Sequence, residues 1–318
     1  MSILTICIPT YNRINDLIYN VRMLKDIIES ENLNEDISII ISDNCSPDNT
    51  RDIVVQEIES YKNIQIIVFK QDSNIGFTKN IIFAINKASA EYCMLLGDDD
   101  YINADYLTRV IHEIKNDKNI TCIFPSYQNI YPDKTHVNGL GRDLNKKTRY
   151  YPKGFLSCCA NIRKTGQMSG LIFRKKGMTE LFTEKGMNNL YPQIFFMMIN
   201  CLNGKSLHLV NFPVLVTHIP QSQKDWKYGS DGLMPDQFEN CINLDLSLIK
   251  LSILEILLFV DAKYLLRNYK YKDLKNIVNH RNTTSITKFF ILLYVPYIKM
   301  EKVLKIIYWT FKSNNNSK

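Results

Sequence analysis

The feature that most constrains the fold is an alternation of two hydrophobic periods over the first 125 residues. Five short runs rich in isoleucine and valine predict strands: Leu4–Pro9, Ile37–Asp43, Ile64–Phe69, Tyr92–Leu96 and Ile120–Phe124. Between these runs, apolar residues recur at spacings of three and four, which is typical of helices with one buried side. Alternating helices and nearly continuous apolar strands predict an α/β fold with a mostly parallel sheet flanked by helices.

Polar residues gather directly after the first four predicted strands. The four segments are Pro9–Arg13, Asp43–Thr50, Asn74–Asn80 and Asp98–Asp100. In a parallel sheet the carboxyl ends of the strands lie at one edge, where loops lead into helices and ligands bind. We therefore expect the four segments to line a single crevice.

The last of these segments places three carboxylates, Asp98, Asp99 and Asp100, directly after Gly97. Adjacent carboxylates repel one another unless a cation lies between them, and their hard oxygen atoms favour Mg²⁺, Mn²⁺ or Ca²⁺. A divalent ion held there would bind the phosphates of a ligand. An acidic turn that only faces water is the alternative interpretation.

Three other residues in these segments have a functional interpretation and a structural one. The Tyr11 ring could stack on the planar base of a nucleotide, or it could simply pack against the protein. The Asp43 carboxylate could accept a hydrogen bond from an N–H group of such a base, or it could cap the next helix. Lys79 lies close to a predicted helix start, where it could bind an anion, or its side chain could lie in solvent. Neither G-x-G-x-x-G nor the P-loop motif occurs, so the sequence supports neither a dinucleotide fold nor a P-loop enzyme.

Taken in order, Ile8–Arg13, Ser42–Asp48, Asn74-x-Gly76 and Leu96–Asp100 resemble the sequence blocks of the family 2 glycosyltransferases, which have the GT-A fold. The resemblance covers residues 3 to 105. It implies an inverting enzyme that moves one sugar from a nucleotide-diphosphate sugar, commonly a UDP-sugar, to a saccharide acceptor. It also implies a divalent ion, Mg²⁺ or Mn²⁺, that binds the diphosphate.

The resemblance assigns roles to individual residues. The candidates for binding the nucleotide sugar are Pro9, Tyr11, Arg13, Asp43, Lys79, Asp98 and Asp99, and those for binding the metal are Asp99, Asp100 and His218. The common family block reads Leu-Asp-x-Asp-Asp, and an ungapped alignment puts Gly97 at its first aspartate. In the other register, Asp98 and Asp100 form the D-x-D. Both registers keep Asp100 near the metal.

Residues 106–236 are expected to form the acceptor side of a catalytic domain spanning residues 1–236, with residues 1–105 as its nucleotide-binding half. Tyr127–Tyr151 is polar, aromatic and basic without clear periodicity, and is predicted to be a long loop over the sugar. Inverting transfer needs a base near the acceptor hydroxyl. Where family members carry this carboxylate, Lys185–Gln193 has none. The nearest candidates for the base are Glu184 and Glu180 upstream and Asp225 or Asp231 downstream, of which we favour Glu184.

Residues 237–318 are predicted to form a helical C-terminal region. The apolar run Phe289–Val295 precedes a basic amphipathic pattern over Met300–Lys312, which is typical of a helix in the headgroup layer of an anionic membrane. The tail Ser313–Lys318 is expected to be disordered. The alternative is a helix packed on the catalytic domain with its lysines in water. No window of about 20 uncharged apolar residues occurs, so no spanning helix is expected.

The composition indicates in which cellular compartment the protein works and what kinds of partner it binds. The formal charge of +7 favours an anionic partner, but neither an RNA-binding aromatic signature nor a zinc-finger spacing occurs, so nucleic acid is not expected. The eight cysteines form no C-x-x-C pair and are predicted to be reduced core residues. The first apolar run is too short for a signal peptide. We expect a cytoplasmic enzyme that lies peripherally at the inner face of the cell membrane.

Two other functions compete with sugar transfer. A sugar nucleotidyltransferase has a related fold but carries a glycine-rich basic loop after the first strand, where this chain has Pro9–Arg13. A protein that binds nucleotides or carbohydrates without catalysis would explain the missing carboxylate in Lys185–Gln193.

Overall fold

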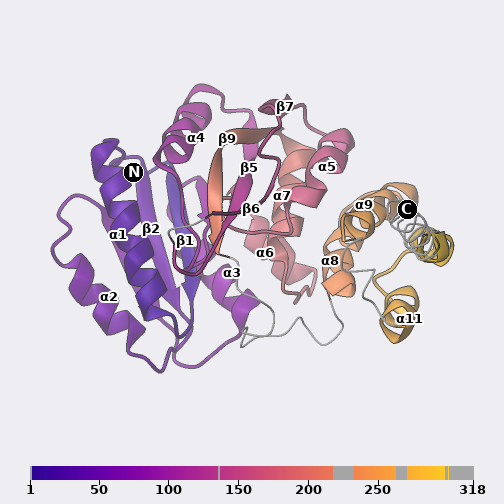
Figure 1. Ribbon diagram of the computed structural model, residues 1–318, viewed down its shortest axis with the longest axis horizontal. Helices are drawn as coiled ribbons and strands as arrows, with labels where there is room; N and C mark the ends of the chain where they lie inside the picture. The colour runs from indigo at the N-terminus through magenta and orange to yellow at the C-terminus, as the bar shows by residue number, and fades with distance from the viewer. Residues whose placement is uncertain (1, 135–136, 218–232, 263–270, 298–299, 301–318) are drawn as a thin grey trace, which may run out of the picture. The chain divides into compact units, whose positions relative to one another are not determined.

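The computed structural model describes residues 2–134, 137–217, 233–262, 271–297 and 300 (Figure 1). The chain forms two compact units, Met1–Lys227 and Tyr228–Lys318. The domain boundary proposed from the sequence, between residues 236 and 237, falls inside helix α8, Leu233–Ile242, which belongs to the second unit.

The first unit is built on one sheet in which nine strands are described. They are β1 Leu4–Thr10, β2 Ile37–Asp43, β3 Gln65–Lys70, β4 Tyr92–Leu95, β5 Ile120–Ile130, β6 Val137–Arg142, β7 Arg149–Tyr151, β8 Ile172–Arg174 and β9 Lys205–Thr217. Their order is β3-β2-β1-β4-β8-β5-β9-β7, and β6 pairs with β5. The five strands predicted from the sequence are all present, so the predicted α/β class is confirmed.

The strand order reverses beside β1. From β1 the chain moves outward to β2 and β3, and then returns to β4 on the other side of β1, with all four strands parallel. Beyond β4, the short strand β8 runs antiparallel to β4 and to β5, so the sheet becomes mixed. A reversal of this kind leaves a crevice beyond the carboxyl ends of the two central strands.

Helices cover both faces of this sheet (Figure 1). They are α1 Ile14–Ser30, α2 Thr50–Ile58, α3 Phe77–Lys87, α4 Ala104–Asn116, α5 Phe155–Asn161, α6 Met178–Glu184 and α7 Pro192–Asn203. In β1, Ile6 and Ile8 join the core that contains Leu17 of α1, whereas the Cys7 thiol donates to the Ala84 carbonyl of α3. Successive side chains of β1 thus face opposite helices, which is why every residue of this strand is buried.

The prediction that the cysteines lie in the core is confirmed for six of them, whereas Cys45 and Cys159 are only partly buried. All eight are free thiols.

The prediction of a long loop over Tyr127–Tyr151 is wrong. Strand β5 continues to Ile130, β6 pairs with it antiparallel, and β7 pairs with β9. Strand β6 has no alternation of apolar and polar residues in the sequence, and its apolar residues Val137 and Leu140 are largely exposed, so no burial pattern marks this strand. In addition, β5 has a register shift between Pro125 and Tyr127, where its apolar run stops.

The second unit is helical, as predicted. It contains α8, α9 Leu248–Asp261, α11 Tyr271–Asn279 and a helix over residues 285–297. Apart from Met300, the expected basic helix over Met300–Lys312 and the tail after it lie outside the described residues. Within the described part of the chain, every helix is too short or too polar to cross a bilayer.

Close packing at the start of β9 leads to a first prediction. A Cβ atom on Gly204 would lie 2.1 Å from Cγ2 and 2.6 Å from Oγ1 of Thr121. The Thr121 hydroxyl is held by its 2.8 Å hydrogen bond to the carbonyl of Asn200, so the side chain cannot turn away without losing that bond. We expect Gly204→Ala to lower the free energy of unfolding by about 1–3 kcal/mol, measured by chemical denaturation.

Gly166 provides the matched control, because a Cβ atom there meets no atom within 4 Å. Equal denaturation midpoints for Gly204→Ala and Gly166→Ala would contradict the clash.

Candidate active site

A cleft of about 500 Å³ lies at the edge of the sheet where the parallel strands end. It is lined by Pro9, Thr10, Tyr11, Arg13, Asn44, Asn74, Phe77, Asn80, Gly97, Asp98, Asp99, Asp100, Gly166, Gln167, Met168, Leu190, Tyr191, Gln193, Val216 and Thr217. The lining includes residues from all four polar segments predicted to meet. It also includes the turn before β8, the start of α7 and the end of β9.

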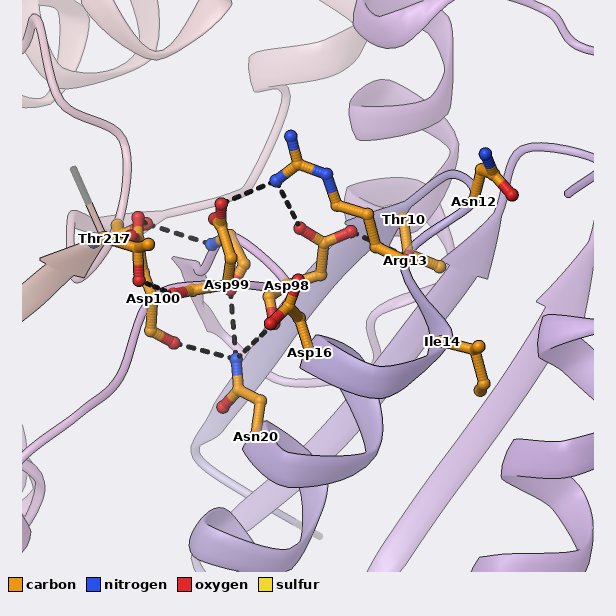
Figure 2. A network of polar contacts seen from close by, with 12 residues as sticks. Thr10, Asn12, Arg13, Ile14, Asp16, Asn20, Asp98, Asp99, Asp100 and Thr217 are labelled. Carbon is orange, nitrogen blue, oxygen red and sulfur yellow. Dashed lines mark hydrogen bonds and ion pairs between the residues drawn. The ribbon is translucent and has the colours of Figure 1, made fainter. Parts of the chain in front are cut away.

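The three aspartates after β4 have different partners (Figure 2). Asp98 accepts a hydrogen bond of 2.8 Å from the Thr10 hydroxyl. Nη1 of Arg13 lies 2.6 Å from Oδ2 of Asp99 and 3.5 Å from Oδ1 of Asp98. The Arg13 guanidinium is therefore the cation that faces these two carboxylates.

Asp100 is bound by residues from the turn before β8 and from the end of β9. Its Oδ2 accepts hydrogen bonds from Oγ of Ser169 at 2.5 Å and from Nε2 of Gln167 at 2.8 Å, and its Oδ1 accepts one from the Thr217 amide at 2.9 Å. A side chain at Gly97 would crowd Asp100 and Ser169, at 3.1 and 3.3 Å. Glycine at this position therefore lets the turn pack closely against Asp100 and Ser169.

The backbone of the acidic turn is held by a residue of α1. Nδ2 of Asn20 lies within hydrogen-bond distance of the carbonyl oxygens of Gly97, Asp98 and Asp100, at 3.0, 3.4 and 2.8 Å (Figure 2). Asn20 is fully buried between the apolar residues of α1. Because the side-chain amide of Asn20 contacts three backbone carbonyl oxygens of the turn, it fixes the backbone conformation of the turn.

The loops after β1 and β2 are joined by hydrogen bonds. The amide of Asn12, which has a left-handed φ of 56°, donates to Oγ of Ser46 at 2.8 Å. The same hydroxyl and the Ser46 amide donate to Oδ1 of Asp43, at 2.5 and 2.9 Å. Asp43 is fully buried, and its Oδ2 has no hydrogen-bond partner among the described residues.

The remaining predicted site residues lie elsewhere or cannot be placed. Lys79 is exposed on α3 and is not part of the cleft lining, although Phe77 and Asn80 beside it are. Glu184 is exposed at the end of α6, also outside the lining. His218 and Asp225 lie outside the described residues.

The family model described as "Glycosyl transferase family 2" matches residues 5–198, more than half of the chain. The chain belongs to glycosyl transferase family 2. A curated relative, the abequosyltransferase RfbV of Salmonella typhimurium, is 27% identical over 233 residues, which cover 67% of this glycosyltransferase and 66% of the relative. The match thus spans just under two thirds of RfbV.

Solved structures show the same GT-A fold. TarS residues 1–349 of S. aureus, crystallised with UDP-GlcNAc, has a TM-score of 0.64 at 18% identity, covering 88% of this glycosyltransferase and 80% of that chain. The mannosyltransferase PcManGT of Pyrobaculum calidifontis, in complex with GDP-Man and Mn²⁺, has a TM-score of 0.53 at 9% identity, covering 95% and 87%. At these identities the likeness concerns the fold alone.

Burial changes the acidity of the aspartates of this glycosyltransferase. Desolvation, and then the charge of Asp99, raise the pKa of Asp98 and of Asp100 to about 7. Desolvation also raises the pKa of Asp99, against the opposing charge of Arg13. Burial therefore makes the three carboxylates costly to ionise with one guanidinium as their only cation among the described residues, and their hard oxygen atoms are a donor set that suits Mg²⁺ or Mn²⁺.

A complete metal site is nevertheless not formed by the described residues alone. They include no group of three or more acidic, histidine or cysteine side chains arranged to hold a metal ion. A metal bound to the aspartates would therefore need a further ligand or a rearrangement of the turn.

Several residues of this site were missed by sequence reasoning. Asn20, Gln167, Ser169 and Thr217 all contact the acidic turn. Only Asn20 left a signal in the sequence, because it is a polar residue beside the buried positions Leu17, Val21 and Leu24 of an amphipathic helix. The other three are common polar residues in irregular segments or at a strand end, so nothing in the pattern distinguished them.

The raised pKa values lead to a second prediction, for protein freed of divalent ions. Between the ordinary aspartate pKa of 3.8 and about 7, the folded chain binds more protons at Asp98 and Asp100 than the unfolded chain does. This contribution to the free energy of unfolding therefore falls as pH rises through that range. We expect Asp100→Asn to stabilise the protein at pH 8 relative to the wild type, and to do so less at pH 5, measured by thermal melting in EDTA.

Asp72→Asn is the control, because Asp72 is exposed. If Asp100→Asn and Asp72→Asn change the melting temperature equally at both pH values, burial does not raise the pKa of Asp100.

Proposed function

We propose that this glycosyltransferase moves a single sugar from a nucleotide-diphosphate sugar to a saccharide acceptor, by an inverting and metal-dependent displacement. The observation that carries the proposal is the acidic turn Asp98–Asp100, which contacts Arg13 and lines a cleft at the reversal of the strand order. A UDP-sugar is the proposed donor, and the UDP-GlcNAc complex of TarS, which has the same fold, supports it. Because PcManGT was solved with GDP-Man, a guanine nucleotide is the second donor to test.

The base of the nucleotide is assigned to Tyr11 and Asp43. The Tyr11 side chain lines the cleft and is 43% exposed, so its ring is available for stacking. The buried and unpartnered Oδ2 of Asp43 needs a donor, which an N–H group of uracil would supply. Asn44, the next residue, lines the cleft and keeps this region in place through a 2.9 Å hydrogen bond to Asn74.

The diphosphate is assigned to Pro9, Arg13 and the acidic turn. Asp99 and Asp100, with His218 one residue beyond Thr217 in sequence, are the proposed ligands of Mg²⁺ or Mn²⁺, and Asp98 contacts the donor ribose or sugar. Bound there, such an ion would stabilise the negative charge that develops on the leaving diphosphate. Arg13 adds a positive charge on the same side. Lys79 stays a weaker candidate, because it lies outside the lining.

The acceptor hydroxyl must lose its proton during a single displacement, so a base is required. Among the described residues, the only carboxylates that line the cleft belong to the acidic turn. The exposed position of Glu184 outside the lining favours Asp225 over Glu184 as the base.

The acceptor is proposed to be a lipid-linked oligosaccharide or a surface polysaccharide precursor, and the enzyme to work in the cytoplasm at the inner face of the membrane. Its relative RfbV, named as an abequosyltransferase, supports transfer of a sugar. The basic pattern over Met300–Lys312 supports contact with an anionic membrane.

A non-catalytic nucleotide- or carbohydrate-binding protein is the second candidate. It is favoured by the carboxylate-free start of α7, where Leu190, Tyr191 and Gln193 line the cleft. Turnover distinguishes the two candidate functions, because a glycosyltransferase consumes a nucleotide sugar and a non-catalytic binding protein does not.

A third prediction tests the nucleotide and the metal together. By isothermal titration, UDP should bind at least tenfold more weakly in EDTA than in Mn²⁺, because the ion bridges the carboxylates and the diphosphate. Asp99→Asn and Asp100→Asn should abolish that difference, and Asp72→Asn should keep it. Equal UDP binding in EDTA and Mn²⁺ would refute the metal assignment, and tighter binding of GDP than of UDP would refute the donor assignment.

A fourth prediction concerns the base. Asp225→Asn should lower kcat about 10²–10⁴-fold, the range expected for loss of a general base, whereas Glu184→Gln should leave it nearly unchanged. Turnover is measured as UDP release from a UDP-sugar with an acceptor present. The reverse pattern would assign the base to Glu184.

A further inference from the structure

The helix over residues 285–297 in the second unit has an exposed apolar side. The exposed large apolar residues there are Ile286, Phe289, Leu292, Leu293, Tyr297 and, just beyond, Met300. Phe289, Leu292 and Leu293 are the most exposed of them, at 66%, 61% and 62%. Because these residues recur at spacings of three and four, they form one stripe along the helix, called here the apolar stripe. Contiguous exposed apolar surface of this kind marks an interaction site.

The opposite side of the same helix is anchored to α9. Oε2 of Glu255, a buried residue of α9, accepts hydrogen bonds from the amide and hydroxyl of Thr284, at 3.0 and 2.8 Å. Thr287 and Ile291 are buried on this side, at 0% and 1% exposure. The helix therefore already has its packing partner, and the apolar stripe is its free side among the described residues.

The surrounding sequence carries most of the positive charge of the protein. Between residues 263 and 318 there are twelve lysines and arginines and two carboxylates, a net formal charge of +10. Since the whole chain has a formal charge of +7, residues 1–262 carry −3. The apolar stripe thus lies within the one strongly basic segment of the chain.

We propose that the apolar stripe inserts into the interface of an anionic phospholipid membrane, while basic residues of the described part of the segment, among them Lys275, Arg281 and Lys288, bind the lipid headgroups. Apolar side chains gain free energy when they leave water, and lysines and arginines near an anionic surface add to the attraction. The helix would lie on the membrane, in keeping with the absence of a spanning helix from the described residues. Membrane binding would give the enzyme access to a lipid-linked acceptor, and only this role of the apolar stripe rests on the proposed function.

The charge also argues against two other occupants. A second copy of the chain seated on the apolar stripe would bring two segments of +10 together, at an electrostatic cost. A nucleic acid would bind the positive charge but would leave Phe289, Leu292 and Leu293 without an apolar partner.

The test uses the full chain with vesicles of phosphatidylcholine alone and of phosphatidylcholine mixed with phosphatidylglycerol. We expect flotation with the anionic vesicles, and less of it as salt is raised. The double variant Phe289→Ser with Leu293→Ser should reduce partitioning about tenfold or more. Leu156→Ser, at a residue of the first unit that is 80% exposed, is the matched control and should bind as the wild type does.

Three results would overturn the proposal: no binding to anionic vesicles, equal binding to neutral vesicles, or unchanged binding by the double variant. A dimer in light scattering that only the double variant dissociates would assign the apolar stripe to a second copy instead. Circular dichroism shows whether each variant is folded.

Turnover separates this proposal from the proposed function. The double variant should release UDP from a UDP-sugar with a soluble acceptor as fast as the wild type does. Vesicle binding without any turnover would overturn the proposed function alone, and turnover without vesicle binding would overturn the membrane proposal alone.

Discussion

The site depends on keeping three adjacent carboxylates in a place from which most water is excluded. Asp98 and Asp100 are almost fully buried, and their charges would repel one another without compensation. Compensation comes from Arg13 after β1, Thr10 at the end of β1 and the Thr217 amide at the end of β9. The acidic turn is therefore a meeting point of strands that are far apart in the sequence.

The acidic turn is held by contacts from two different parts of the first unit. Asn20 of α1 holds the backbone of the turn, and Ser169, just before β8, accepts from the Gly97 amide while donating to Asp100. One contact comes from residues 1–105 and the other from residues 106–236. A shift of either half would change the carboxylate geometry, so the cleft couples the two.

Polar contacts join the loops that follow β1, β2 and β3. Ser46 joins the loop after β1 to Asp43, and Asn44 joins the loop after β2 to Asn74 and Ile75. These bonds leave one oxygen of Asp43 without a partner inside an otherwise satisfied network. A buried acceptor that lacks a partner costs free energy unless a donor reaches it.

The sequence by itself determined the strand and helix pattern of the first half, and with it the α/β class and the crevice after the strands. It did so because buried parallel strands need long apolar runs and because loops after them must be polar, as in Leu4–Pro9 followed by Thr10–Arg13. Its blocks also identified the family, since glycines, prolines and aspartates at those loops leave distinctive spacings.

Only the tertiary structure decided which side chains meet. Hydrogen bonds from Ser169 and Thr217 to Asp100 join residues 69 and 117 positions apart, and no local period records such a pairing. The exposed strands β6 and β7 were hidden for the same reason, because their pairing with β5 and β9 depends on backbone hydrogen bonds and not on apolar side chains. The sequence reports what must be buried, whereas the geometry of polar partners appears only when distant segments are brought together.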